Sequence, residues 1–273
     1  MSSAITQPGL SAYVLTKDSE RYLAEILGQL NRFADEVVVL DSGSRDTTRA
    51  IAEAAGACFL EQPFTDFRTQ RGIAEAACRN DFIFFCDCDE RPDDALVTAI
   101  QQARQAGLDQ AAYDVLRDWQ AYGKLVRVVY PITSPDRVPR LYDRRRCQWE
   151  PDKRVHEGLL VDGPRRLLGG RLAHLTFETQ AEVDEKLARY TDLAALALVE
   201  RCARKGHSPR WAALQHGLQA WTFSPLGAVL KSYLVRRGFL DGRVGLKLML
   251  YAVRYSHLKH WKAARQLAVR ASG

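Results

Sequence analysis

The sequence predicts an α/β protein: a doubly wound, mostly parallel sheet with a helical, amphipathic C-terminal extension. Three observations support this prediction. Short apolar runs alternate with helical patterns through the first hundred residues, later segments are interrupted by Pro and charge, and from about residue 180 apolar residues recur every three or four positions. Strands that are apolar on both faces are typical of a parallel sheet covered by helices, whereas the last pattern is that of amphipathic helices.

The first part of the chain supplies the parallel strands. Runs rich in Val, Ile and Phe predict strands, and the amphipathic stretches between them predict helices. Two of the strands end in an aspartate, Asp41 and Asp87. Because ligands of such sheets bind beyond the carboxyl ends of the strands, these acids are candidate binding residues. The expected strands are 11–16, 36–41, 57–61 and 81–87, and the expected helices are 19–31, 46–55, 68–79 and 93–105.

After residue 110 the pattern changes. Shorter segments that contain Pro and charged residues predict antiparallel strands with long loops, built onto the first sheet. From about residue 180 the sequence predicts helices, and Gly206 and Pro209 mark the end of the first long one.

The 273 residues carry a formal net charge of +6, which is distributed unevenly. Residues 225–273 contain ten Lys or Arg and one acid, Asp241, so this segment carries +9 and the rest carries −3. The excess indicates an anionic partner for the C-terminal segment. Six cysteines without a CxxC pair favour a reduced, cytosolic protein. The sequence shows no signal-peptide pattern and no run of roughly 18 to 20 apolar residues.

The segment FFCDCDE places acids at the end of a buried strand. Asp87 and Asp89 are two residues apart, so an extended backbone would put both on one side, where their charges repel unless a cation lies between them. Mg²⁺ or Mn²⁺ is the expected ion, because both prefer carboxylate and phosphate oxygens. The alternative is that these acids cap the helix that begins near Pro92. Cys86 and Cys88 are expected to fill a tight sheet rather than to bind a metal.

The segment VVVLDSGSRDTT is the second candidate site. Asp41 leaves the strand, the small residues 42–44 form a loop, and Asp46 opens a helix. A strand-end acid can accept hydrogen bonds from a nucleobase or a ribose, and small residues leave room for a ligand against the backbone. Asp46 is expected to act mainly as a helix N-cap, which leaves Asp41 as the candidate ligand-binding residue.

The C-terminal segment 225–273 interleaves apolar and basic residues and predicts two amphipathic helices that are broken near residues 241–242. Such helices lie in the headgroup region of an anionic leaflet, so we expect peripheral docking on a membrane. The alternative is a helical hairpin packed on the protein core or on a second subunit. No nucleic-acid-binding motif accompanies the charge, and nucleic acid is not expected as a partner.

Three segments resemble, in order and spacing, the nucleotide-sugar domain of the family 2 glycosyltransferases, which have the GT-A fold. They are SAYVLTKDSERYLAEIL, VVVLDSGSRDTTRAIAEAAGA and TQRGIAEAACRNDFIFFCDCDERP. The chain most resembles the small bacterial enzymes that add a hexose to the lipopolysaccharide inner core, such as β-1,4-glucosyltransferases. The resemblance includes the later segments KRVHEGLLVDG and RRGFLDGRVGL. It implies an inverting, metal-dependent transfer of a hexose, glucose above all, from a UDP-sugar to lipopolysaccharide core or a related cell-envelope glycan.

The resemblance also implies roles for individual residues. Asp41 would bind uracil or ribose. Asp87 and Asp89 would form the DxD pair of the family, the first nearer the ribose and the second nearer the metal on the diphosphate. Gly72 stands where the family commonly has Asn. The other donor-site residues would be Thr16, Lys17 and Asp18, which follow the first strand, and the helix residues Arg68 and Arg71.

An inverting transferase also needs a base that removes the proton of the acceptor hydroxyl as its oxygen attacks C1. Glu157 is the expected base and Asp152 the alternative, and His156 would orient the acceptor or the diphosphate. Arg140 and Arg154 are expected to anchor the diphosphate or an anionic acceptor, because guanidinium groups match phosphate geometry.

These roles divide the chain into three expected regions. Residues 1–110 would bind the nucleotide sugar, residues 111–178 would form the acceptor-binding half of the same domain, and residues 179–273 would dock on the membrane. A lipid-linked glycan acceptor implies a cytoplasmic protein that is peripheral on the anionic inner face of the cytoplasmic membrane.

Two other functions fit the sequence less well. A sugar nucleotidyltransferase would need a Gly-rich loop after the first strand, where this chain has LTKDSERY. A non-catalytic glycan-binding module at the membrane surface would not need the acids at the strand ends.

Overall fold

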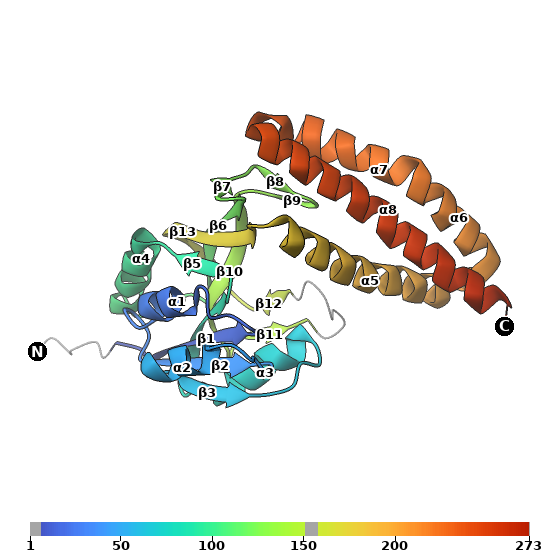
Figure 1. The fold of residues 1–273 in the computed structure, drawn as a ribbon. Helices are drawn as coiled ribbons and strands as arrows, with labels where there is room; N and C mark the ends of the chain where they lie inside the picture. Colours follow the sequence, from blue (N-terminus) through green and yellow to red (C-terminus); the bar gives the residue numbers. More distant parts are fainter. Residues whose placement is uncertain (1–6, 151–157, 273) are drawn as a thin grey trace, which may run out of the picture. The chain divides into compact units, whose positions relative to one another are not determined.

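The computed structural model describes residues 7–150 and 158–272, which form two compact units (Figure 1). The first unit comprises residues 7–118 together with Asp136–His174, and the second comprises Trp119–Pro135 together with residues 175–272.

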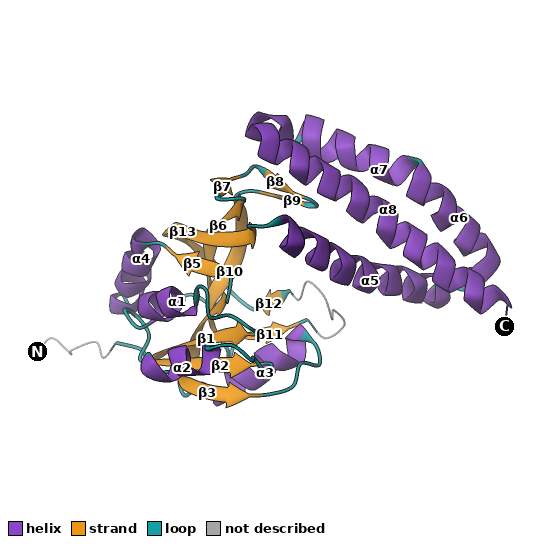
Figure 2. Ribbon diagram, in the orientation of Figure 1, coloured by secondary structure: helices purple, strands orange, loops and turns teal. Residues whose placement is uncertain are grey.

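The first unit begins with alternating strands and helices, as the sequence predicts (Figure 2). β1 lies between β2 and β4, and these strands run parallel, with β3 parallel to β2. The predicted strands and helices of this region are confirmed. They are β1 (Leu10–Thr16), α1 (Leu23–Leu30), β2 (Glu36–Asp41), α2 (Thr48–Ala54), β3 (Cys58–Glu61), α3 (Phe67–Ala77), β4 (Phe82–Asp87) and α4 (Asp94–Gln105). The short strand β5 (Glu90–Pro92), which follows β4 in the chain, is not among the predicted strands.

Apolar cores lie on both faces of the parallel strands. On β1, Ala12 and Val14 belong to a core that contains Leu27 of α1, whereas Tyr13 belongs to a core that contains Ala74 of α3. Successive side chains of a strand point to opposite faces, which explains why this strand is apolar at nearly every position. The doubly wound arrangement is thus confirmed, and the carboxyl ends of β1, β2 and β4 meet at one edge of the sheet.

The later strands are antiparallel, as predicted. The sheet has the order β3-β2-β1-β4-β10-β6-β13-β5, with β7 beside β6. β10 pairs with β4, and β13 pairs with β5 so that His174 lies opposite Glu90. This pairing brings distant residues to the carboxyl end of β4. The strands are β6 (Ala112–Ala121), β7 (Lys124–Leu125), β8 (Val128–Val129), β9 (Ile132–Thr133), β10 (Asp136–Asp143), β11 (Cys147–Trp149), β12 (Leu159–Val161) and β13 (Arg165–Phe177).

The second unit is helical from Gln180 onward, as predicted. The chain turns sharply before its last helix. The turn brings Gly245, in the first turns of that helix, so close to Gly238 that a Cβ atom on Gly245 would lie 2.0 Å from the Gly238 carbonyl oxygen. The predicted break near residues 241–242 is therefore confirmed. The helices are α5 (Gln180–Arg204), α6 (Pro209–Trp221), α7 (Phe223–Ala228), the π-helix η1 (Val229–Val235), the 3₁₀ turn η2 (Gly238–Asp241) and α8 (Gly242–Ser272).

The core of the second unit is built around α8. Leu248 and Tyr251 of α8 pack with Val183 and Leu187 of α5 and with Phe177. Much of the apolar surface of α8 is thus used inside the unit. In the part of the chain that the structure describes, no helix is long and apolar enough to cross a membrane.

Candidate functional site

The loops that follow β1 and β2 are joined by hydrogen bonds at the carboxyl edge of the sheet. The Asp18 amide donates to Ser44 Oγ (2.7 Å), and the Arg45 amide donates to Asp18 Oδ1 (2.8 Å). Lys17 Nζ donates to the Gly43 carbonyl oxygen. Further along, Glu20 Oε2 accepts from the amide (3.1 Å) and the hydroxyl (2.8 Å) of Thr47. These contacts hold residues 17–20 and 42–47 as one surface.

Asp41 is the anchor of that surface. Its carboxylate is 1% exposed and accepts hydrogen bonds from Thr16 Oγ1 (2.8 Å), the Gly43 amide (2.8 Å), and both the amide (2.6 Å) and the hydroxyl of Ser44. Burial raises the pKa of Asp41, but the hydrogen bonds from Ser44, Thr16 and Gly43 outweigh it and lower the pKa below its ordinary value. Asp41 is therefore ionised. The hydrogen-bond donors named here are all neutral hydroxyl or amide groups.

The structure thus brings together the predicted residues Thr16, Lys17, Asp18 and Asp41. Thr16 lies opposite Asp41 across the β1–β2 pair, and Lys17 and Asp18 are exposed on the loop above them. Asp46, expected as an N-cap, accepts from the Thr48 amide (3.0 Å) at the start of α2 and also from the Glu20 amide (3.0 Å).

The acids after β4 do not cap the following helix. Asp93 fills that role, because its Oδ1 accepts from the Leu96 amide (2.7 Å) at the start of α4. β4 ends at Asp87, and Cys88 and Asp89 form a turn before β5 begins at Glu90. The capping alternative is therefore wrong for Asp87 and Asp89, although the strand does not persist through Asp89.

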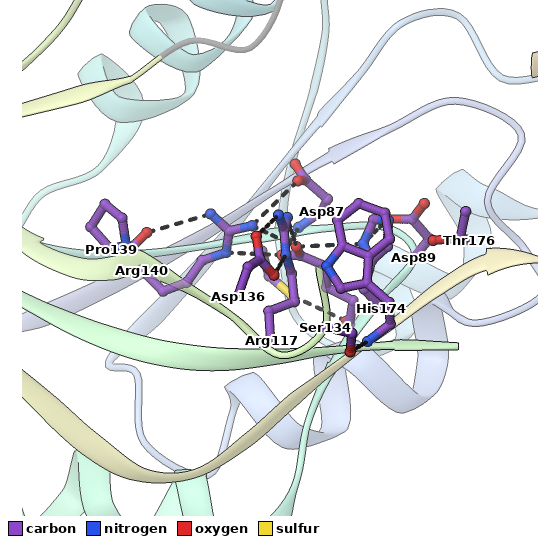
Figure 3. Close-up of polar contacts among 12 residues, drawn as sticks. Asp87, Asp89, Arg117, Ser134, Asp136, Pro139, Arg140, His174 and Thr176 are labelled. Carbon is purple, nitrogen blue, oxygen red and sulfur yellow. Dashed lines mark hydrogen bonds and ion pairs between the residues drawn. The ribbon is translucent and has the colours of Figure 1, made fainter. Parts of the chain in front are cut away.

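Glu90 is the centre of a buried ionic cluster, and Figure 3 shows the surrounding residues Arg117, Arg140 and His174. Its side chain is fully buried and accepts from Arg117 Nη1 (2.9 Å) and from Arg140 Nε (3.0 Å) and Nη2. His174 Nδ1 lies 3.6 Å from Glu90 Oε1, and Arg117 also binds Asp136 (2.7 Å). Burial raises the pKa of Glu90, but the charge of Arg140, the hydrogen bond from His174 and the charge of Arg117 hold that pKa well below its ordinary value.

Asp87 lies beside this cluster and is paired with arginines. Its Oδ1 accepts from Arg71 Nη2 (2.9 Å), and its Oδ2 lies 3.8 Å from Arg140 Nη2. The Arg71 guanidinium lies 4.7 Å from the ring centre of Phe85 and 5.2 Å from that of Trp149, which fixes its position by cation–π contact. Arg71 thus reaches the site from α3, whereas the predicted Arg68 is exposed on the same helix.

Asp89 is partly exposed, and its Oδ1 lies 3.5 Å from His174 Nδ1. With Glu90, Asp87 and Asp136 it belongs to a group of acids that lie close to Arg71, Arg117, Arg140 and His174. Within residues 7–150 and 158–272 no group of three or more His, Cys, Asp or Glu side chains is arranged to hold a metal ion. A Mg²⁺-type ion needs only one or two protein carboxylates when phosphate oxygens supply other ligands, and the donor set of Asp87 and Asp89 fits that requirement.

The remaining predicted residues fall in two places. Arg140 lies on β10, is buried and faces Glu90. The expected base Glu157, its alternative Asp152, and His156 and Arg154 lie outside the described residues.

Sequence reasoning missed Glu90, Arg117 and His174. Glu90 directly follows the DxD segment, and its position next to two other acids could have drawn attention to it. Arg117 and His174 carry no local signal, because they reach Glu90 only through the pairing of β6, β13 and β5.

Comparison with known proteins matches residues 11–153 to the family model "Glycosyl transferase family 2", which is just over half of the chain. This range contains every residue that the sequence predicts for the donor site. Among curated relatives, the lipopolysaccharide core biosynthesis glycosyltransferase LpsC of Rhizobium meliloti (strain 1021) is 29% identical over 212 residues, which are 74% of each protein.

Other similarities are shorter or more distant. An uncharacterized glycosyltransferase of Rickettsia bellii is 37% identical over 90 residues, which are 33% of this chain and 30% of that protein, so the chain spans about a third of its length. Glucosyl-3-phosphoglycerate synthase from Mycobacterium tuberculosis, crystallised in complex with Mn²⁺, UDP and glucosyl-3-phosphoglycerate, is 20% identical. Its TM-score is 0.38, with 50% of this chain and 57% of that chain covered.

Proposed function

Because the chain belongs to glycosyltransferase family 2, we propose that it transfers a hexose, glucose above all, from a UDP-sugar to lipopolysaccharide core or a related cell-envelope glycan, with inversion at C1. One observation carries the proposal. Asp41, Asp87 and Asp89 lie at or just beyond the carboxyl ends of β2 and β4, the two strands that flank β1, at the edge where ligands of such sheets bind. The similarity to LpsC over 74% of the chain supports the acceptor class.

The donor would lie across this edge. Uracil or ribose would contact the surface formed by Asp41, Thr16, Lys17 and Asp18, where small residues of the β2 loop leave the backbone accessible. Asp87 would lie nearer the ribose. Arg71 and Arg68 would support the nucleotide from α3.

A divalent ion, Mg²⁺ or Mn²⁺, would be held by Asp89 and Asp87, and when bound it would offset the charge that develops on the leaving diphosphate. The position of the two carboxylates at the carboxyl end of β4 supports this assignment. Arg140 is a candidate anchor for the diphosphate or an anionic acceptor. Because its guanidinium also binds Glu90, we expect it to fix the position of Asp87 as well.

Glu157 is proposed as the base that takes the proton from the acceptor hydroxyl while that oxygen attacks C1 from the face opposite the leaving group. Asp152 is the alternative base. His156 and Arg154 would orient the acceptor or the diphosphate. A lipid-linked glycan acceptor would place the protein at the anionic inner face of the cytoplasmic membrane.

Titration with UDP and Mn²⁺ tests the donor site. We expect thermal stabilisation that requires both, because a ligand that binds only the folded state raises its apparent stability. Asp89→Ala should remove the metal-dependent part of this thermal stabilisation. Asp94→Ala, which removes an exposed acid on α4, is the matched control and should behave as the wild type. Unchanged metal-dependent UDP affinity in Asp89→Ala would show that the metal role is wrong.

The base is tested separately by turnover. Glu157→Gln should leave UDP binding intact while transfer collapses, because only the proton acceptor is lost. Normal turnover in this variant, with collapse in Asp152→Asn, would transfer the role to Asp152. Mass spectrometry of envelope glycan from a strain lacking the protein would identify the missing sugar and the truncated acceptor.

A further inference from the structure

The helical segment 209–235, which comprises α6, α7 and η1, packs against α8, and Figure 1 shows α6 and α7 beside that helix. Ala212, His216 and Ala220 of α6, Ala228 of α7 and Ser232 of η1 are its buried residues. Apart from His216 these residues are small, which lets the segment approach α8 closely. The large apolar residues of the segment are therefore left on its other side.

We call these large residues the outer stripe. Each is between 52% and 78% exposed, and most are spaced by three or four residues, which places them along one side of a helical path. Soluble proteins rarely expose a contiguous apolar patch of this kind unless it binds something. The outer stripe consists of Trp211, Leu214, Leu218, Trp221, Phe223, Leu226, Leu230 and Leu234.

The charge around the outer stripe has one sign. From Arg201 to Leu240 the chain contains no Asp or Glu. The acid that follows, Asp241, has a side chain only 4% exposed, and it accepts from the amide (2.7 Å) and Nη1 (2.7 Å) of Arg127. Exposed basic residues in the same segment include Arg210, Lys231 and Arg237.

The exposed apolar stripe and the positive charge around it together favour one kind of binding partner. A second copy of the chain would bring two stripes with the same positive charge together, which is unfavourable. A spanning arrangement is excluded for the described helices by their length and hydropathy. An anionic bilayer surface offers an apolar layer for Trp, Phe and Leu and phosphate groups for Arg and Lys.

We propose that the outer stripe is the face that docks on an anionic membrane, with its side chains inserted at the level of the headgroups. The inference deepens the proposed function, since a lipid-linked acceptor is presented at such a surface, and it rests on that function for its biological meaning. It also moves the docking surface from residues 225–273, where the sequence places it, to 209–235, because α8 buries much of its apolar surface inside the unit.

Flotation with vesicles of phosphatidylglycerol and phosphatidylcholine tests the proposal on the full-length protein. The wild type should float with phosphatidylglycerol-containing vesicles and much less with pure phosphatidylcholine. The stripe variant Leu218→Gln/Phe223→Gln/Leu226→Gln should lose binding by about tenfold or more, because buried apolar area and charge both contribute to interfacial affinity. The control variant Leu125→Gln/Leu196→Gln/Val269→Gln, which removes exposed apolar residues elsewhere, should bind as the wild type.

Circular dichroism and hydrolysis of UDP-glucose in solution report on folding and donor chemistry in the same preparations. Stripe-variant binding equal to that of the wild type would overturn the proposal. The proposal would also be overturned if the wild type did not bind vesicles but self-associated, while the stripe variant was monomeric. The outer stripe would then be an interface between two copies of the chain. Vesicle binding that depends on the stripe, in a protein that neither binds UDP nor hydrolyses UDP-glucose, would uphold the docking face and reject the transferase.

Discussion

Asp41 at the end of β2 and Glu90 just beyond the end of β4 are buried acids at one edge of the same sheet, and both have a lowered pKa. Their surroundings differ. Asp41 is held by hydroxyl and amide donors that carry no charge, whereas Glu90 is held by two arginines with His174 nearby. Each environment suits a different part of the proposed donor. Neutral donors and small residues fit an uncharged base and ribose, and the ionic cluster fits a metal and a diphosphate.

The two acids should differ most in how much each contributes to the free energy of unfolding. Glu90→Gln removes the charge that buried Arg117 and Arg140 face, and breaking a buried pair by removing one partner costs about 3–5 kcal/mol. Urea unfolding measures the loss. Glu25→Gln, an exposed acid paired with Arg91, is the control and should cost about 0.5 kcal/mol or less. A loss for Glu90→Gln as small as that of the control would mean that the cluster is solvated.

Asp41→Asn should have an intermediate effect. Its amide keeps one acceptor oxygen but turns an NH₂ group towards donors of Thr16 and Ser44, so we expect a loss of about 1–3 kcal/mol. The same unfolding measurement applies, with the exposed Asp109→Asn as control. A loss larger than that of Glu90→Gln would reverse the comparison between the two strand ends.

Acid titration of stability separates the two carboxylates further. A carboxyl whose folded pKa is lowered stabilises the fold above its ordinary pKa, and this contribution is lost as the pH falls towards the folded pKa. Below about pH 4, each variant should therefore lose stability less steeply than the wild type, by up to about 1.4 kcal/mol per pH unit. The effect should reach to lower pH for Glu90→Gln, because that pKa lies well below its ordinary value. Identical slopes in all three proteins would contradict the lowered pKa values.

Ser44→Ala should have the smallest effect, about 1 kcal/mol, because one hydroxyl that binds Asp41 and the Asp18 amide is lost. The UDP affinity of Ser44→Ala also tests whether the two strand ends bind different parts of the donor. If the loop surface binds the base or ribose, the affinity should fall without a change in metal dependence. A change in the metal dependence of UDP binding would instead show that the two strand ends do not act independently.

The parallel strands and their terminal acids are predictable from sequence because they depend on local patterns. Apolar runs predict the strands, and Asp41 and Asp87 follow directly from where those runs end. The cluster around Glu90 is not predictable in this way. His174 faces Glu90 only because β13 pairs with β5, and such a pairing between distant segments leaves no trace in either one.

The proposed membrane-docking face shows a second limit of sequence reasoning. The apolar and basic pattern predicts amphipathic helices, but it does not tell which side of each helix is covered. Ala212, Ala220 and Ala228 are small enough to be covered by α8, whereas the larger Trp221 and Leu226 remain exposed. The pattern of residue size, rather than that of hydropathy, carried the relevant signal.

The hydrogen bonds between residues 17–20 and 42–47 have a thermodynamic consequence. Because folding alone has already restricted these two loops, a nucleotide arriving there has little backbone left to order, and the entropic penalty of binding at this end should be small. Calorimetry on Ser44→Ala would show that penalty growing, as loosened loops must be fixed again by each ligand that enters.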